Sequence, residues 1–168
     1  MPAPTPFLDP NNFPMETILD REAIRKYNRQ RFEWEQLTAI TMLDVERRIV
    51  AGYRDYEHDE WWTKGHFPGK PLVPGVLMLE AAAQACSLYV AHFKLVKSDE
   101  LMGFGGVEDV RFRGAVVPGQ RMLLVCHAQR NSSKLMRVDA QGFVEGQMVF
   151  HGRVIGVPLR IESPAATP

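Results

Sequence analysis

The sequence predicts an α+β fold in which an antiparallel sheet wraps around one long central helix. The segment from Gly75 to about Phe93 is apolar on nearly all sides, carries a single acid and is long enough for a buried helix. The segments around it are short, rich in β-branched residues and separated by turns, which is typical of antiparallel strands. Because water cannot cover such a helix favourably, the sheet is expected to pack around it.

Each element follows from its own local pattern. Residues 1–14, rich in proline and asparagine, are predicted to be a flexible N-terminal arm, and the helix formers of 15–28 predict a helix. Residues 37–56 predict one or two strands with a turn near 44–48, and residues 57–74, which include three prolines, predict a loop. The later strands are expected at about 101–112, 122–129, 135–144 and 147–158, with turns at 117–119, 131–133 and 145–146.

Length and composition limit the class of protein. A chain of 168 residues fits one domain, which we place at 15–158 with a C-terminal tail at 159–168. The 20 basic and 20 acidic side chains cancel, so neither nucleic acid nor a membrane is an expected partner. Residues 1–14 lack the pattern of a secretion signal, and Cys86 and Cys126 lack CxxC or Cys/His ligand spacing. A cytoplasmic protein with two reduced thiols is therefore expected.

One group of residues has the spacing of a catalytic site. His66 lies in a loop rich in glycine and proline, and Glu80 follows fourteen residues later on the buried helix. Gln84 lies one turn beyond Glu80 on the same face. A histidine can act as a base at neutral pH, and a carboxyl in an apolar setting has a raised pKa and can stay protonated as an acid. Taken singly, each residue would usually be structural, but the combination favours a catalytic pair.

The start of the helix offers a place where negative charge can develop. Pro74 precedes Gly75, as is common where a helix begins. Free N–H groups at Gly75 and Val76 could stabilise a thioester carbonyl oxygen while the neighbouring carbon loses its proton. Glycine would let the substrate approach the backbone closely. Base, acid and oxyanion donor are the parts that dehydration of a 3-hydroxyacyl thioester requires.

The run HFPGKPLVPGVLMLEAAAQ at residues 66–84 resembles the β-hydroxyacyl-[acyl-carrier-protein] dehydratases of type II fatty acid synthesis. Residues 60–65 and 106–119 resemble the same family, and the resemblance covers about 22–157. It implies the hot-dog fold, a homodimer or trimer of dimers, acyl carrier protein as partner, and no metal or organic cofactor. The implied roles are base for His66, acid for Glu80, partner of the acid for Gln84 and oxyanion donor for Gly75. It also implies that one site takes His66 and Glu80 from different subunits.

One residue and two segments bear on which branch of the family the chain resembles and on its substrate. Position 80 is glutamate, as in the branch that only dehydrates, whereas the branch that also isomerises the double bond has aspartate. Residues 30–38 lack the family's usual proline and aspartate, and Trp61-Trp62 replaces a Pro-Phe pair. We expect the change at 30–38 to lie away from the chemistry and to affect substrate range. We expect the tryptophans to reshape the edge of the site.

Two further groups are weaker candidates, because core packing or surface solvation explains them equally well. The side chains expected along an acyl tunnel are Phe67, Leu72, Val76 and Phe104. The cations expected to dock the acidic carrier protein or a phosphopantetheine phosphate are Arg111, Arg113 and Arg121.

The main functional prediction is a hydro-lyase that converts (3R)-3-hydroxyacyl thioesters on acyl carrier protein to trans-2-enoyl thioesters, in fatty acid or related lipid biosynthesis. A thioesterase, or a hydratase acting on coenzyme A esters, is an alternative on the same fold. A non-catalytic acyl-binding subunit is a third hypothesis, motivated by the altered segment at 30–38.

Overall fold

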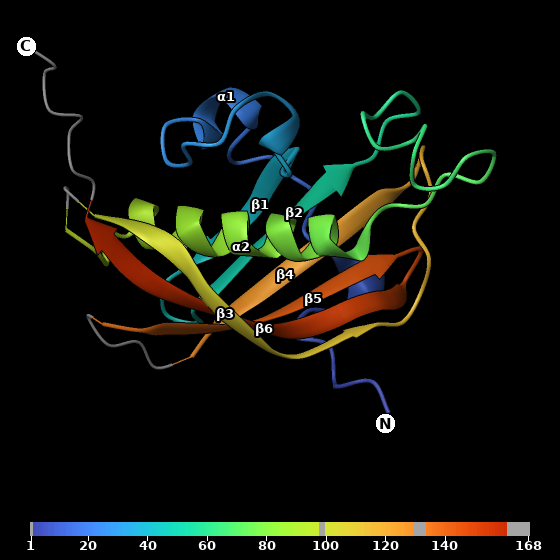
Figure 1. Cartoon of the computed structure of the whole chain (residues 1–168). Coiled ribbons are helices and arrows are strands. Elements are labelled where there is room, and N and C mark those ends of the chain that lie inside the picture. Colours follow the sequence, from blue (N-terminus) through green and yellow to red (C-terminus); the bar gives the residue numbers. More distant parts are fainter. Residues whose placement is uncertain (1, 98–99, 130–133, 161–168) are drawn as a thin grey trace, which may run out of the picture.

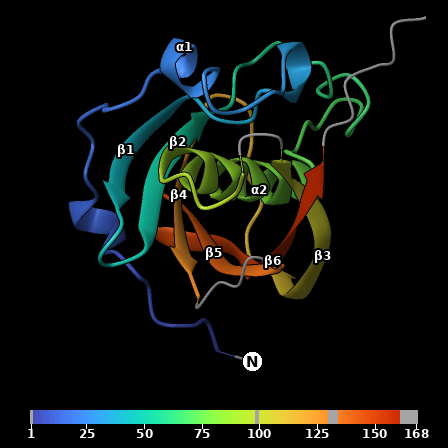
Figure 2. The same ribbon diagram turned by 90° about the vertical axis from the view of Figure 1, so that its left-hand side faces the viewer.

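Six antiparallel strands form one curved sheet in a computed structural model of the chain, and a long helix, α2 (Gly75–His92), lies against its concave side (Figures 1 and 2). The structure describes residues 2–97, 100–129 and 134–160. In spatial order the strands are β1 (Ala39–Asp44), β2 (Ile49–Asp55), β4 (Arg121–Ala128), β5 (Met136–Val144), β6 (Gln147–Arg160) and β3 (Glu100–Phe112). This arrangement is the hot-dog fold, and it confirms the predicted fold class.

Helix α2 is the centre of the hydrophobic core. Ten of its residues are buried, and they pack with sheet side chains such as Val50, Leu124 and Phe150. Both cysteines are buried in this core as free thiols. Among the described residues, neither α2 nor any other helix is long and apolar enough to cross a membrane. Because α2 begins directly after the His66 loop, the packing of the helix also fixes one end of that loop.

Strand β3 forms one edge of the sheet, since its neighbour in the strand order is β6 alone. The register between the two strands shifts twice, between Phe104 and Gly106 and between Glu108 and Arg111. Three apolar side chains of β3 are about half exposed: Phe104 at 54%, Val107 at 42% and Phe112 at 50%. An edge strand with such side chains can pair with another chain.

The predicted helix at 15–28 is largely wrong, because only α1 (Arg21–Ile24) is helical. The backbone of Leu19 instead pairs with Ile40 on the free edge of β1, with N···O distances of 2.8 and 3.1 Å. An edge strand offers backbone groups that compete with a helix for the same hydrogen bonds. Helix α1 starts only after this bridge, where the side chain of Asp20 accepts a hydrogen bond from the N–H of Ala23.

The N-terminal segment, predicted to be flexible, makes specific contacts with the outer face of the sheet. Phe13 is buried in a small cluster with residues of β2, β4 and β5. The side-chain amide of Gln141 binds the backbone twice, to the N–H of Phe7 and the carbonyl of Thr5, both at 2.9 Å. At the other end, β6 continues to Arg160, two residues beyond its predicted limit. The rest of the predicted tail and the predicted turn at 131–133 lie outside the described residues.

Candidate active site

Helix α2 holds Glu80 and Gln84 on one face, as their spacing predicts. The Nε2 of Gln84 donates a hydrogen bond to Oε1 of Glu80 at 2.8 Å. Gln84 is only 2% exposed, whereas Glu80 is partly exposed and lines a hollow beside the helix. The buried amide of Gln84 therefore holds Oε1 of the carboxyl by a hydrogen bond, and Oε2 is left for a substrate.

The segment 34–36 fixes the direction of the Gln84 amide. Its Oε1 accepts the N–H of Gln36 at 2.9 Å, and its Nε2 donates to the carbonyl of Trp34 at 2.5 Å as well as to Glu80. A backbone N–H can only donate and a carbonyl can only accept, so the NH₂ group must face Glu80. The expectation that 30–38 lies away from the chemistry is therefore wrong: this segment contacts the partner of the acid directly.

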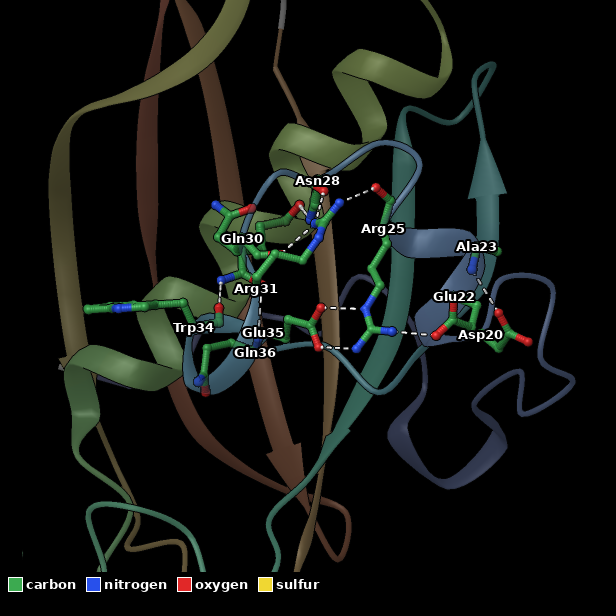
Figure 3. A network of polar contacts seen from close by, with 11 residues as sticks. Asp20, Glu22, Ala23, Arg25, Asn28, Gln30, Arg31, Trp34, Glu35 and Gln36 are labelled. Atoms are coloured by element: carbon green, nitrogen blue, oxygen red, sulfur yellow. Dashed lines mark hydrogen bonds and ion pairs between the residues drawn. The ribbon is translucent and has the colours of Figure 1, made fainter.

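A polar network holds that segment in place (Figure 3). The guanidinium of Arg25 forms a two-pronged ion pair with Glu35, at 2.6 and 2.9 Å, and a further ion pair with Glu22. Arg31 donates to the backbone carbonyl of Asn28 at 2.9 Å, and the side chain of Asn28 donates to the carbonyl of Gln84 at 3.0 Å. Bidentate arginine pairs give geometric specificity. The network thus holds the segment 34–36 where it positions the side chain of Gln84.

The environment of Glu80 favours its protonated form. Burial raises the pKa of this carboxyl above its usual value, and the hydrogen bond from Gln84 opposes part of that rise. With Oε1 occupied as an acceptor, the proton of the neutral acid belongs on Oε2. This is the state that a general acid needs at neutral pH.

The environment of His66 prepares the opposite role. Its Nδ1 lies 2.9 Å from the carbonyl oxygen of Leu72. Because a carbonyl only accepts, Nδ1 must carry the hydrogen, and the lone pair of the neutral ring is then on Nε2. The ring also stacks on Phe67, with centroids 4.1 Å apart, so its orientation is held from two sides. The two contacts therefore fix which ring nitrogen is open to accept a proton.

A hollow at the N-terminus of α2 brings His66 together with Gly75. Leu72, Val76 and Phe112 also line it, whereas Phe67 stacks outside it. Gly75 is the first residue of the helix, so its N–H has no carbonyl partner within the helix. The hollow therefore places the imidazole of His66 on the same surface as a backbone N–H that has no partner within the helix.

Gly75→Ala is expected to lower activity roughly tenfold with little loss of stability, because small displacements of reacting groups are costly. A Cβ at this position would lie 2.8 Å from two carbons of the Phe112 ring, so that this ring, which lines the hollow, must shift. The matched control is Gly65→Ala in the same loop, where a Cβ would meet nothing within 4 Å. Turnover and thermal melting of both variants test this, and equal activities would show that the space at Gly75 is not needed.

Glu80 lines a different hollow, between α2, β3 and the segment before β1. Ala83, Met102 and Phe104 are among its mainly apolar walls, so Phe104 lies where an acyl chain bound at Glu80 would run. His66 does not line this hollow, and Glu80 does not line the one at Gly75. Within one chain the two halves of the predicted site are thus separate.

The three candidate docking arginines do not form one cluster. Arg111 and Arg113 lie at the end of β3 near His151, to which Arg113 donates a hydrogen bond at 3.0 Å. Arg121 is bound to both oxygens of Asp55, at 2.5 and 2.7 Å, and its guanidinium covers the ring of Tyr53. Arg121 thus joins β4 to β2, and a structural role accounts for it.

The paired tryptophans separate into two environments. Trp62 is 3% exposed and packs edge-on against Tyr56, whereas Trp61 is 56% exposed. Neither tryptophan lines the hollow of His66 or that of Glu80. Trp62 therefore acts as a core residue beneath the loop, and only Trp61 could contribute to an outer edge.

Fold and site together define a hot-dog protein with a histidine loop and a half-buried acid on its central helix. The chain matches the FabA-like domain family over residues 29–153, which include both His66 and Glu80. The chain belongs to this family.

Relatives and solved structures agree with this assignment. The chain is 35% identical to the 3-hydroxyacyl-[acyl-carrier-protein] dehydratase FabZ of Nitratidesulfovibrio vulgaris, over 80% of this chain and 88% of the relative. For the FabZ of Lawsonia intracellularis the identity is 36%, over 61% of this chain and 68% of the relative. The dehydratase heterocomplex ApeI:P of Xenorhabdus doucetiae has a TM-score of 0.69 at 15% identity, covering 82% of this chain and 91% of that chain. A thioesterase superfamily member from Thermus thermophilus has a TM-score of 0.56 at 17% identity, covering 67% and 81%. The two structural likenesses show a shared fold.

Proposed function

We propose that the chain dehydrates (3R)-3-hydroxyacyl thioesters of acyl carrier protein to trans-2-enoyl thioesters in the cytoplasm, in fatty acid or related lipid biosynthesis. The observation that carries this proposal is the geometry of two side chains: Glu80, half-buried and held through Oε1 by Gln84 with its pKa raised by burial, and His66, whose Nδ1 is held by the carbonyl of Leu72. The names of the relatives support the substrate class, since they are 3-hydroxyacyl-[acyl-carrier-protein] dehydratases.

In the proposed reaction, Nε2 of His66 removes a proton from C2 of the substrate. The electron pair forms the C2–C3 double bond as the bond from C3 to the hydroxyl oxygen breaks. The proton on Oε2 of Glu80 passes to the departing hydroxyl, which leaves as water. The N–H of Gly75 stabilises the thioester oxygen while C2 loses its proton. Transfer of the proton from His66 back to Glu80, through solvent, resets the site.

The active form in this proposal is at least a dimer. His66 and Glu80 line separate hollows within one chain, so a second copy must supply the missing half of each site. The free edge of β3, with Phe104, Val107 and Phe112 about half exposed, offers a surface for that copy. Pairing of two β3 strands would remove these side chains from water and bring the two subunits' sites together.

The carrier protein is proposed to dock at Arg111 and Arg113. These cations flank Phe112, which lines the hollow of His66. Acidic partners and phosphate groups are held well by arginine, and a thioester bound there would have its carbonyl close to Gly75. Arg121 is left out of this surface because Asp55 neutralises it.

The proposal is tested by incubating the purified protein with a 3-hydroxyacyl thioester of acyl carrier protein. Appearance of enoyl absorbance, abolished in His66→Ala, is the expected result. Release of free thiol without an enoyl product would assign a thioesterase instead. Tight binding of the acyl carrier protein with no reaction would assign the non-catalytic acyl-binding subunit.

A further inference from the structure

A basic groove lies at the end of α2 that is far from His66. Six cations line it, and we define it by the five that have no carboxylate partner among the described residues: Lys26, Arg29, Arg31, Lys94 and Lys97. The first three come from the segment after α1, and the two lysines follow the C-terminus of α2. Glu100 is the acid among its lining residues, and one oxygen of its carboxylate accepts the backbone N–H of Lys97 at 3.2 Å.

The basic groove carries an excess of positive charge in the part of the chain that the structure describes. Among the described residues, none of the groove's five cations lies within ion-pair distance of a carboxylate. The sixth lining cation, Arg25, is bound by both Glu22 and Glu35. Since the whole chain has a formal net charge of zero, this excess is local. Arg31 donates to three backbone carbonyls, which leave its charge in place. A concave cluster of cations without carboxylate partners attracts anions.

The basic groove is continuous with the hollow that Glu80 lines. Gln30, Ser87 and Met102 line both, so an extended molecule can pass from one to the other. The walls of the hollow at Glu80 are mainly apolar, with Ala83 and Phe104 among them, whereas two of the three shared residues, Gln30 and Ser87, are polar. Along α2, the acid Glu80 is therefore followed by the apolar hollow and then by the cations of the basic groove. From Glu80 to His92, the last residue of the helix, α2 rises by about 18 Å, at about 1.5 Å per residue, and Lys94 follows two residues later.

The proposed chemistry fixes which end of the substrate enters the apolar hollow. Glu80 acts on the hydroxyl at C3, whereas the base and the oxyanion donor act on C2 and on the thioester carbonyl, in the hollow at Gly75. The carrier arm therefore leaves on the side of Gly75. The acyl carbons beyond C3 continue past Glu80 along the apolar hollow and end at the basic groove.

We propose that the substrates of this chain are medium- to long-chain 3-hydroxyacyl thioesters whose far end carries a carboxylate, which the basic groove binds. This rests on the proposed function, because that reaction gives the acyl chain its direction. An uncharged methyl end would make no polar contact with the cations, whereas a carboxylate at the end of the chain can form charge-assisted hydrogen bonds with several of them.

The test compares two carrier-protein substrates of equal chain length, one ending in a methyl group and one in a carboxylate. The unmodified protein is expected to have a roughly tenfold higher kcat/KM for the carboxylate substrate at low salt, and to lose this preference at about 0.5 M salt. The double variant Lys94→Gln/Lys97→Gln is expected to lose the preference at any salt. Both side chains are exposed, so the fold should tolerate the change. Arg47→Gln, an exposed cation in the β1–β2 turn, is the matched control and should keep the preference.

Two results would overturn the assignment of the groove. One is equal or better turnover of the methyl substrate by the unmodified protein. The other is an equal loss on both substrates in the double variant, which would mean that the groove holds the carrier protein or its phosphate. If neither substrate is dehydrated, the proposed function fails first. Calorimetric binding of the two thioesters to Glu80→Gln protein then tests the groove separately, and absence of tighter binding for the carboxylate form would refute it.

Discussion

Glu80→Gln is expected to lower kcat by roughly 10²- to 10⁴-fold, the usual contribution of a positioned general acid. Glutamine has nearly the same shape, and its side-chain oxygen can still accept the hydrogen bond from Gln84. The variant therefore keeps the packing of α2 and loses only the proton that the departing hydroxyl needs. Initial rates of enoyl formation at saturating substrate measure the effect.

The same variant is expected to be more stable than the unmodified protein at neutral pH. Because burial raises the pKa of Glu80 in the folded state, the folded protein binds this proton more tightly than the unfolded chain does. Its stabilising contribution is full below the unfolded value of about 4.5 and decreases as the pH rises toward the raised folded value. Glutamine, which does not ionise, avoids that loss.

Thermal melting between pH 4 and pH 8 checks this sign. The gain of Glu80→Gln over the unmodified protein should grow with pH and then level off. Glu46→Gln, an exposed carboxyl in the β1–β2 turn, serves as the control and should show no such trend. A variant that melts lower at pH 8 than the unmodified protein would mean that the Glu80 carboxylate is stabilised, contrary to its assigned role as the acid.

The sequence predicts well what depends on local pattern. The boundaries of α2 and of β3 to β6 lie within about two residues of those expected. These elements are marked by apolar runs, by alternation of apolar and polar residues and by turn residues, all of which are local features of the sequence. The helix at 15–28 fails for the opposite reason. Its residues are adequate helix formers, but the free edge of β1 at Ile40 takes the backbone of Leu19.

In the candidate site, too, some residues could be predicted from the sequence and others could not. His66, Glu80 and Gln84 stand out because the chemistry needs those side-chain types at that spacing. The groups that orient Gln84 do not stand out, because they are backbone atoms of Trp34 and Gln36, about fifty positions away and independent of side-chain identity. A signal was nevertheless present, because residues 30–38 depart from the family pattern, and such a segment is a candidate for contact with the site.

If each site is divided between two subunits, two inactive variants should regain activity when they are combined in one dimer. His66→Ala and Glu80→Gln are each expected to be nearly inactive as homodimers. A heterodimer of the two has one site with both substitutions and one site with both original residues. Co-expressed chains with different tags, purified so that only heterodimers remain, should therefore regain roughly half of the unmodified activity.

The control for this recovery is a heterodimer of His66→Ala with the double variant His66→Ala/Glu80→Gln. No site in that pair contains His66, so it should stay inactive although its subunits assemble in the same way. The division of the site between subunits would be contradicted if the heterodimer of a His66→Ala chain with a Glu80→Gln chain is inactive although its tags show that it has assembled. Since one chain places His66 and Glu80 in separate hollows, such a result would also require the loop at 65–73 to move toward Glu80 within its own chain. Recovery to about half would instead fix the dimer as the smallest catalytic unit and the β3 edge as the place to look for its interface.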